Sequence, residues 1–83
     1  MLIIYQLKTS RQEKKAVLNL NSFFYPTQVL EKTAKEFSEI CAVKISRKEN
    51  RTFLELNIKG KYSEEEVALN FINHATALRK EMF

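Results

Sequence analysis

The sequence predicts an α+β fold with the element order ββαββα, in which a four-stranded, mainly antiparallel sheet carries two helices packed on one face. Three observations predict it: two stretches with apolar residues at helical spacing, stretches of alternating apolar and polar residues, and a short internal repeat. The repeat is Leu18-Asn19-Leu20-Asn21, which returns as Leu54-Glu55-Leu56-Asn57. With 83 residues, the chain suits one domain spanning residues 1–83.

The first two strands are predicted in the first quarter of the chain. Residues 16–21 alternate in a way that is typical of a strand with one buried face. The inward set is Ala16, Leu18 and Leu20. Residues 2–7 form an apolar run rich in branched and aromatic side chains, which predicts the partner strand of a hairpin. The register of this hairpin cannot be read, because both faces of residues 2–7 are apolar.

The first helix is predicted from Pro26 onward. Apolar residues recur there at three- and four-residue spacing, while charged residues fill the other face. Proline suits the first helical turn because its missing N–H would have no partner within the helix. The apolar stripe consists of Val29, Leu30, Ala34, Phe37 and Cys41.

The second hairpin is predicted between residues 41 and 58. Apolar and polar residues alternate in both of its strands, and the polar run from Arg47 to Arg51 predicts the turn between them. The inward positions are Cys41, Val43 and Ile45 in the first strand and Leu54, Leu56 and Ile58 in the second.

The second helix has the clearest start signal. Ser63 is followed by Glu64, Glu65 and Glu66, which predicts a capping box at residues 63–66. Acidic residues also suit the positive end of the helix dipole, so we interpret the three glutamates as structural rather than as a metal or acid–base cluster. The core stripe of this helix consists of Val67, Ala68, Phe71, Ile72, Ala75, Leu78 and Met82.

The composition argues against catalysis and against a bound cofactor or metal. Gly60 is the only glycine, so the glycine-rich loops that hold nucleotide phosphates are absent. One cysteine and one histidine cannot assemble a Cys/His zinc site, and there is no Asp to orient the imidazole. We interpret Cys41 as a core residue and His74 as a boundary residue. We predict no enzyme activity, no cofactor and no metal.

The expected location is the cytoplasm. A single cysteine allows no internal disulfide, which suits a reducing compartment. The first five residues lack the basic region of a signal peptide, and no segment approaches the roughly 18 apolar residues that span a membrane. We therefore expect no membrane partner.

The net charge of +4 is distributed unevenly along the chain. Residues 8–15 and residues 44–51 each hold four cations and one glutamate, a net charge of +3, and such clusters favour phosphate contacts with nucleic acid. In the predicted topology, however, the two basic turns lie at opposite ends of the sheet, about 24 Å apart. Nucleic acid is therefore the second choice of partner. The residues that would bind it are Lys14, Lys15, Arg47, Lys48 and Arg51.

Aromatic and apolar residues outside the predicted core favour a protein partner. The sheet face away from the helices would carry Val17 and Phe53, together with one side of residues 2–7. Three consecutive aromatics precede the first helix, and a chain cannot bury all three in one direction. Such a surface fits a protein, a peptide or a second copy of the chain. The predicted contact residues are Phe23, Phe24, Tyr25 and Phe53.

The last three-quarters of the chain contain five short features whose order along the sequence is similar to that of a known family. They are the strand Leu18-Asn19-Leu20, the helix start Tyr25-Pro26-Thr27 with the helix from Val29 to Phe37, the hairpin from Cys41 to Ile58, the helix start Ser63-Glu64-Glu65-Glu66, and the ending Leu78-Arg79-Lys80. In these features, the segment from Leu18 to Met82 resembles the small His-Xaa-Ser system protein HxsD. The resemblance implies an accessory protein that accompanies radical-SAM maturases in peptide modification and has no chemistry of its own.

The sequence thus predicts a non-catalytic adaptor domain that presents its sheet to a protein or peptide partner. The alternative is a small basic module that binds nucleic acid.

Overall fold

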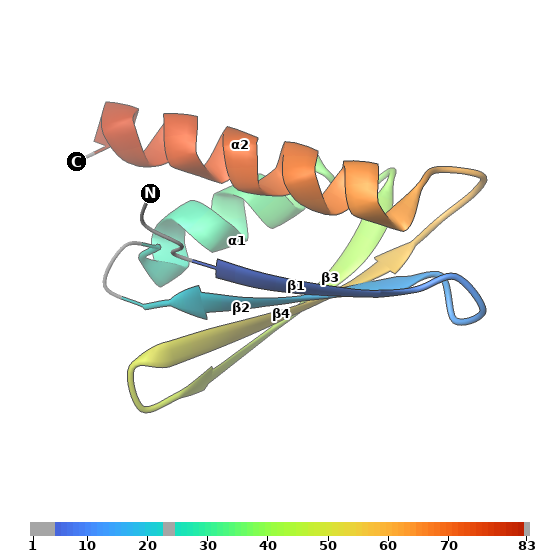
Figure 1. The fold of residues 1–83 in the computed structure, drawn as a ribbon. Helices are drawn as coiled ribbons and strands as arrows, with labels where there is room; N and C mark the ends of the chain where they lie inside the picture. The colour runs from blue at the N-terminus through green and yellow to red at the C-terminus, as the bar shows by residue number, and fades with distance from the viewer. Residues whose placement is uncertain (1–4, 23–24, 83) are drawn as a thin grey trace.

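The structure, a computed structural model, describes residues 5–22 and 25–82 and confirms the predicted element order. Figure 1 shows a single sheet with both helices on one side of it. The elements are β1 (Tyr5–Ser10), β2 (Lys15–Asn21), α1 (Thr27–Glu36), β3 (Cys41–Lys48), β4 (Arg51–Ile58) and α2 (Glu64–Met82).

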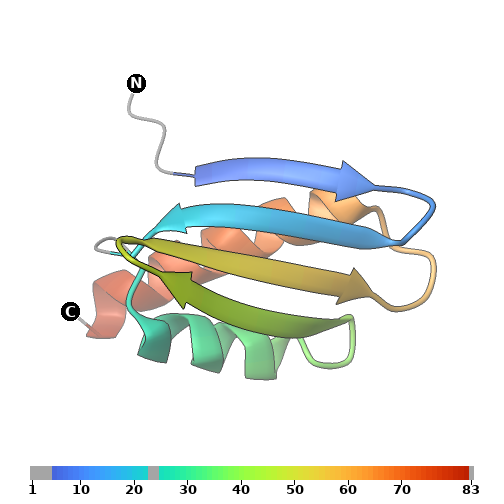
Figure 2. The ribbon, with the colours of Figure 1, turned by 90° about the horizontal axis from the view of Figure 1, so that it is seen from below.

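The four strands lie in the order β1-β2-β4-β3, and every neighbouring pair is antiparallel. The two strands that carry the sequence repeat, β2 and β4, are at the centre, and β1 and β3 are the edges (Figure 2). β2, α1 and β3 form a split β-α-β unit with β4 between its strands. Moving β1 to the end of the chain would give β-α-β-β-α-β, the element order of the ferredoxin-like fold.

The hydrophobic core lies between the sheet and the helix layer. Leu18 of β2 pairs directly with Leu54 of β4, and both are fully buried. Phe37, directly after the end of α1, packs against Phe71 of α2, and the two ring centroids lie 5.3 Å apart in an edge-to-face arrangement. Buried residues alternate with more exposed ones along β2 and β4, as predicted. The other buried apolar residues are Ala16, Leu20, Tyr25, Val29, Leu30, Cys41, Leu56, Ile58, Val67, Ala68, Ile72, Ala75 and Leu78.

Both helix starts agree with the sequence signals. The Ser63 hydroxyl oxygen accepts a hydrogen bond from the Glu66 N–H at 3.4 Å, as expected for the Ser63 half of a capping box. Pro26 occupies the N-cap of α1, one residue before the helix begins at Thr27. α1 ends at Glu36, and residues 37–40 form the turn into β3.

The second hairpin turn is shorter than predicted. β3 continues to Lys48 and β4 begins at Arg51, so that Glu49 and Asn50 alone form the turn. The five-residue turn predicted from Arg47 to Arg51 was wrong, because strand pairing uses backbone groups and the charged side chains of Arg47 and Lys48 remain exposed to solvent. As a result, the side chains of Arg47 and Lys48 point to opposite faces of the sheet.

Candidate functional site

The sheet face that points away from the helices, seen in Figure 2, is named the open face. Residues directly opposite each other in an antiparallel pair lie on the same face, so the strand registers define its members. They are Gln6, Lys8 and Ser10 of β1, Lys15, Val17, Asn19 and Asn21 of β2, Arg51, Phe53, Glu55 and Asn57 of β4, and Ala42, Lys44, Ser46 and Lys48 of β3.

The open face carries a net charge equal to that of the whole chain. Of the 14 cations and 10 glutamates of the sequence, five cations and one glutamate, Glu55, lie on this face, a net charge of +4. The remaining nine cations and nine glutamates balance. All of the uncompensated charge therefore lies on one side of the sheet. The five cations are Lys8, Lys15, Lys44, Lys48 and Arg51.

The centre of the open face holds an apolar pair, Phe53 and Val17, together with the carboxylate of Glu55, which lies directly opposite Val17. Phe53 is 36% exposed, and Val17 beside it is half-buried. Both residues line two shallow depressions, one on the β3 side of about 310 Å³ that includes Lys44, and one on the β1 side of about 110 Å³ that includes Lys8. Each depression combines the same apolar pair with one lysine, and the β3-side depression is also lined by the carboxylate of Glu55.

The cations lie around this centre. Lys8 and Lys44 occupy the two edge strands, and the registers align them in one row across the sheet, about 14 Å apart at the usual strand spacing. Lys15 lies at one end of the central strands, and Arg51 and Lys48 lie at the other end, about 20 Å away at the usual rise per residue. We call these five side chains the cation ring.

Polar contacts hold part of the ring in place. Lys15 Nζ lies 3.2 Å from a carboxylate oxygen of Glu55, and the Asn57 side chain donates to the other oxygen at 3.4 Å. These two contacts hold the pKa of Glu55 below its usual range, so this carboxylate is ionised at neutral pH. At the other end, Arg51 Nε donates to the side-chain oxygen of Asn19 at 3.0 Å. The ring is therefore partly ordered before any partner binds.

The predicted partner-binding aromatics do not form one cluster. Phe53 is on the open face as expected. Tyr25 is only 2% exposed, and its hydroxyl lies 3.2 Å from the Thr76 hydroxyl of α2, so its ring belongs to the core and is not available to a partner. Its assignment to a contact surface is corrected accordingly. Phe23 and Phe24 lie outside the described residues.

The residues predicted for nucleic-acid binding are divided between different surfaces. Lys14 lies in the β1–β2 turn, where its amine donates to the Gly60 carbonyl at 3.3 Å. Arg47 lies opposite the buried Thr52, on the helix side of the sheet, and its guanidinium donates to the Thr27 hydroxyl of α1. The other three, Lys15, Lys48 and Arg51, belong to the cation ring.

Two members of the ring, Lys8 and Lys44, were not assigned to any site from the sequence. The signal for Lys44 was present, because Val43 and Ile45 were expected to point inward and the residue between them must point outward. No such signal existed for Lys8, because the register of the first hairpin could not be read. The open face therefore has two cations that were not predicted as site residues, and both lie on edge strands.

The remaining reactive side chains have structural surroundings. Cys41 is 1% exposed, as predicted, and burial raises the pKa of its thiol, an effect that the charge of Lys59 partly opposes. The side chain of His74 is 45% exposed, pairs with Glu36 and lies against the ring of Phe37 at a centroid distance of 5.7 Å. His74 thus joins α2 to the end of α1.

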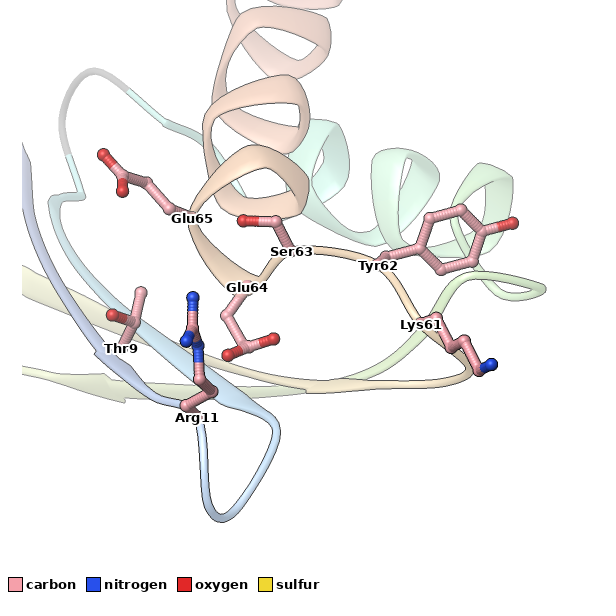
Figure 3. A pocket seen from close by; sticks show the side chains of 7 residues that line it. All are labelled: Thr9, Arg11, Lys61, Tyr62, Ser63, Glu64 and Glu65. Carbon is pink, nitrogen blue, oxygen red and sulfur yellow. The ribbon is translucent and has the colours of Figure 1, made fainter.

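A further depression, of about 380 Å³, lies where the β1–β2 turn meets the start of α2 (Figure 3). Its lining mixes the cations Arg11 and Lys61 with the carboxylates of Glu64 and Glu65. These carboxylates already supply the negative charge that a helix N-terminus favours. Figure 3 also shows Lys61 turned away from Arg11, so the two cations do not converge. We assign these residues to the helix start.

Comparison of the chain with models of protein families, with curated proteins and with solved structures finds no match. Within residues 5–22 and 25–82, no group of three or more His, Cys or Glu side chains is placed to hold a metal ion. Neither helix in this part of the chain has the length and apolar character needed to span a lipid bilayer.

Proposed function

We propose that this chain is a non-catalytic adaptor domain that binds a protein or peptide partner through the open face of its sheet. The observation that supports the proposal is the arrangement of the cation ring around the apolar pair Phe53 and Val17, with Glu55 as the one carboxylate inside the ring. Protein interfaces have this organisation, with an apolar core that is desolvated on binding and a polar rim that stays in contact with water.

Phe53 is the central residue of the proposed interface. In the register it lies between Asn19 and Ser46, on the side of the sheet opposite to the core. A large aromatic side chain in this position adds nothing to the packing between sheet and helices. Its remaining exposed surface would be buried by a partner, and aromatic side chains contribute strongly when they are buried at the centre of an interface.

A second copy of the chain fits the open face poorly. Two open faces brought together would each carry a net charge of +4, and like charges across an interface oppose association. Pairing through the edges is also disfavoured, because Lys8 lies on β1 and Lys44 and Lys48 lie on β3, and lysines on edge strands protect against strand addition. The proposed partner is therefore a different chain.

The resemblance of residues 18–82 to HxsD supports the same proposal. An accessory protein without chemistry of its own would act by binding, and its partner would be a component of a radical-SAM peptide-modification system.

Photo-cross-linking tests the proposal. The variant Phe53→benzoylphenylalanine keeps an aromatic group at the centre of the open face, and the matched control Lys32→benzoylphenylalanine places the same group on the exposed side of α1. After irradiation of native cells, we expect a discrete protein adduct from position 53 that is absent from position 32. The same adducts from both positions, adducts to nucleic acid only, or none from position 53 would contradict the proposal.

A further inference from the structure

The charge of the open face has few partners within the chain. Lys15 is compensated by Glu55, whose charge also acts on Lys44 directly opposite it, whereas Lys8 and Lys48 form no ion pair with any described residue. A surface with a net charge of +4 attracts a partner of opposite sign and raises its rate of association. The partner surface that matches it is therefore rich in carboxylates.

The two depressions set a second requirement for the chemistry of the partner. Both are lined by Val17, Phe53 and a lysine, Lys8 toward β1 and Lys44 toward β3, and the β3-side depression is also lined by Glu55. A ligand that fills the β1-side depression places apolar atoms against the aromatic ring and an anionic group within reach of the Lys8 ammonium, whereas Glu55 already supplies a carboxylate on the β3 side. Both requirements are met by an apolar residue with acidic neighbours.

The size of the cation ring sets the length of the bound segment. The distance of about 20 Å from Lys15 to the row of Arg51 and Lys48 corresponds to about six residues of extended chain. The width of about 14 Å between Lys8 and Lys44 leaves room for one such segment with its side chains on both sides.

We infer that the open face binds an extended acidic segment of a protein, about six residues long, in which carboxylates flank an apolar side chain seated against Phe53 and Val17. The inference rests on the proposed adaptor function and specifies the chemistry of its partner.

Single-stranded nucleic acid would also bring negative charge, but it fits the centre of the face less well. Sheets that bind RNA stack two or three bases on aromatic side chains of adjacent strands. Among the described residues of the open face, Phe53 is the single aromatic, and its neighbour in both depressions is the aliphatic Val17. An aliphatic side chain packs against an apolar residue but offers no stacking surface.

Fluorescence anisotropy with four labelled probes tests the inference. The probes are an acetylated hexapeptide of alternating glutamate and leucine, its analogues with glutamine in place of glutamate and with serine in place of leucine, and a single-stranded hexanucleotide of mixed sequence. We expect the glutamate–leucine peptide to bind about tenfold more tightly than either analogue, and binding to weaken as salt rises.

Two double variants that remove the same charge from different surfaces show where the glutamate–leucine peptide binds. Lys8→Gln with Lys44→Gln removes one lysine from each depression, and Lys32→Gln with Lys35→Gln removes the same charge from the exposed side of α1. We expect about threefold to tenfold weaker binding of the glutamate–leucine peptide for the first pair and no change for the second. Far-ultraviolet circular dichroism shows whether each variant is folded.

The outcomes separate the inference from the proposed function. If the glutamate and glutamine peptides bind equally and Phe53→Ala weakens both, the acidic partner is overturned while the open face remains a peptide-binding surface. Tighter binding of the hexanucleotide than of the glutamate–leucine peptide, or no binding of any probe, also overturns the inference. The cross-link from position 53 tests the adaptor function independently of all four probes.

Discussion

Lys48 and Arg51 lie directly opposite each other at the closed end of the second hairpin, and both belong to the cation ring. Like charges in this position destabilise a strand pair, and opposite charges stabilise it, by about 0.2–1 kcal/mol each. Lys48→Glu converts the first case into the second. The two effects add to about 0.4–2 kcal/mol, and because Lys48 is exposed we expect a gain in the lower part of this sum, about 0.5–1 kcal/mol in the free energy of unfolding.

Thermal unfolding followed by circular dichroism measures this gain. For a domain of this size, about 0.5–1 kcal/mol raises Tm by about 2–8 °C. The rise should shrink at about 1 M salt, where the Debye length falls to about 3 Å. Lys32→Glu on α1 is the control, because it changes the net charge equally but adds a carboxylate four residues before Glu36, which destabilises a helix.

If local charge pairing determines stability, Lys48→Glu raises the free energy of unfolding and Lys32→Glu lowers it. A Lys48→Glu protein that is no more stable than the original chain at low salt would refute the cross-strand argument. Stabilisation by both variants would instead assign the effect to the lower net charge. If Lys48→Glu is more stable and binds the glutamate–leucine peptide more weakly, Lys48 is retained for binding at a cost in stability.

Three further predictions concern the side chains of Phe71, Cys41 and Glu55. Phe71→Ala removes a fully buried ring, and we expect guanidinium denaturation to show a loss of about 3–5 kcal/mol in the free energy of unfolding; a loss below about 1 kcal/mol would contradict the packing described. The buried Cys41 thiol, whose pKa is raised by burial, should react with a thiol reagent only as fast as the chain unfolds, and rapid labelling of the folded protein would contradict its position. The pKa of Glu55 is lowered in the folded state by its bond to Lys15, so its contribution to stability is present above the unfolded pKa and lost as the pH falls through the folded pKa. Urea denaturation across the acid range should therefore show a flatter pH dependence for Glu55→Gln, and an unchanged curve would count against this pair.

Local patterns were sufficient to predict the elements of the fold. The alternation around Leu18 and Leu54 identified the two central strands, and the run from Ser63 to Glu66 identified the start of α2. The strand order and the direct pairing of Leu18 with Leu54 were not predicted, because they depend on how the helices cover the sheet. Such long-range packing leaves no signal within a single strand.

The candidate site was predicted only in part. Phe53 and Val17 were placed on the outer face from their alternation with buried leucines. The cations were assigned to turns because charged runs usually mark them, and the strands continue through Arg47 and Lys48 instead. Counting positions from the inward residues of β3 and β4 would have placed Lys44, Lys48 and Arg51 on one face. Tyr25 was misassigned because its burial depends on α2, which lies far away in sequence.

Mapping of backbone amide shifts by nuclear magnetic resonance tests the central claim most directly, which is that the open face is the binding surface. In a titration of the labelled protein with the glutamate–leucine peptide, we predict that the largest shifts fall in the four strands around Val17, Phe53 and Lys44, with α1 and the outer side of α2 unchanged. Shifts concentrated on the helices would contradict this claim, and so would a spectrum that the peptide leaves unaltered.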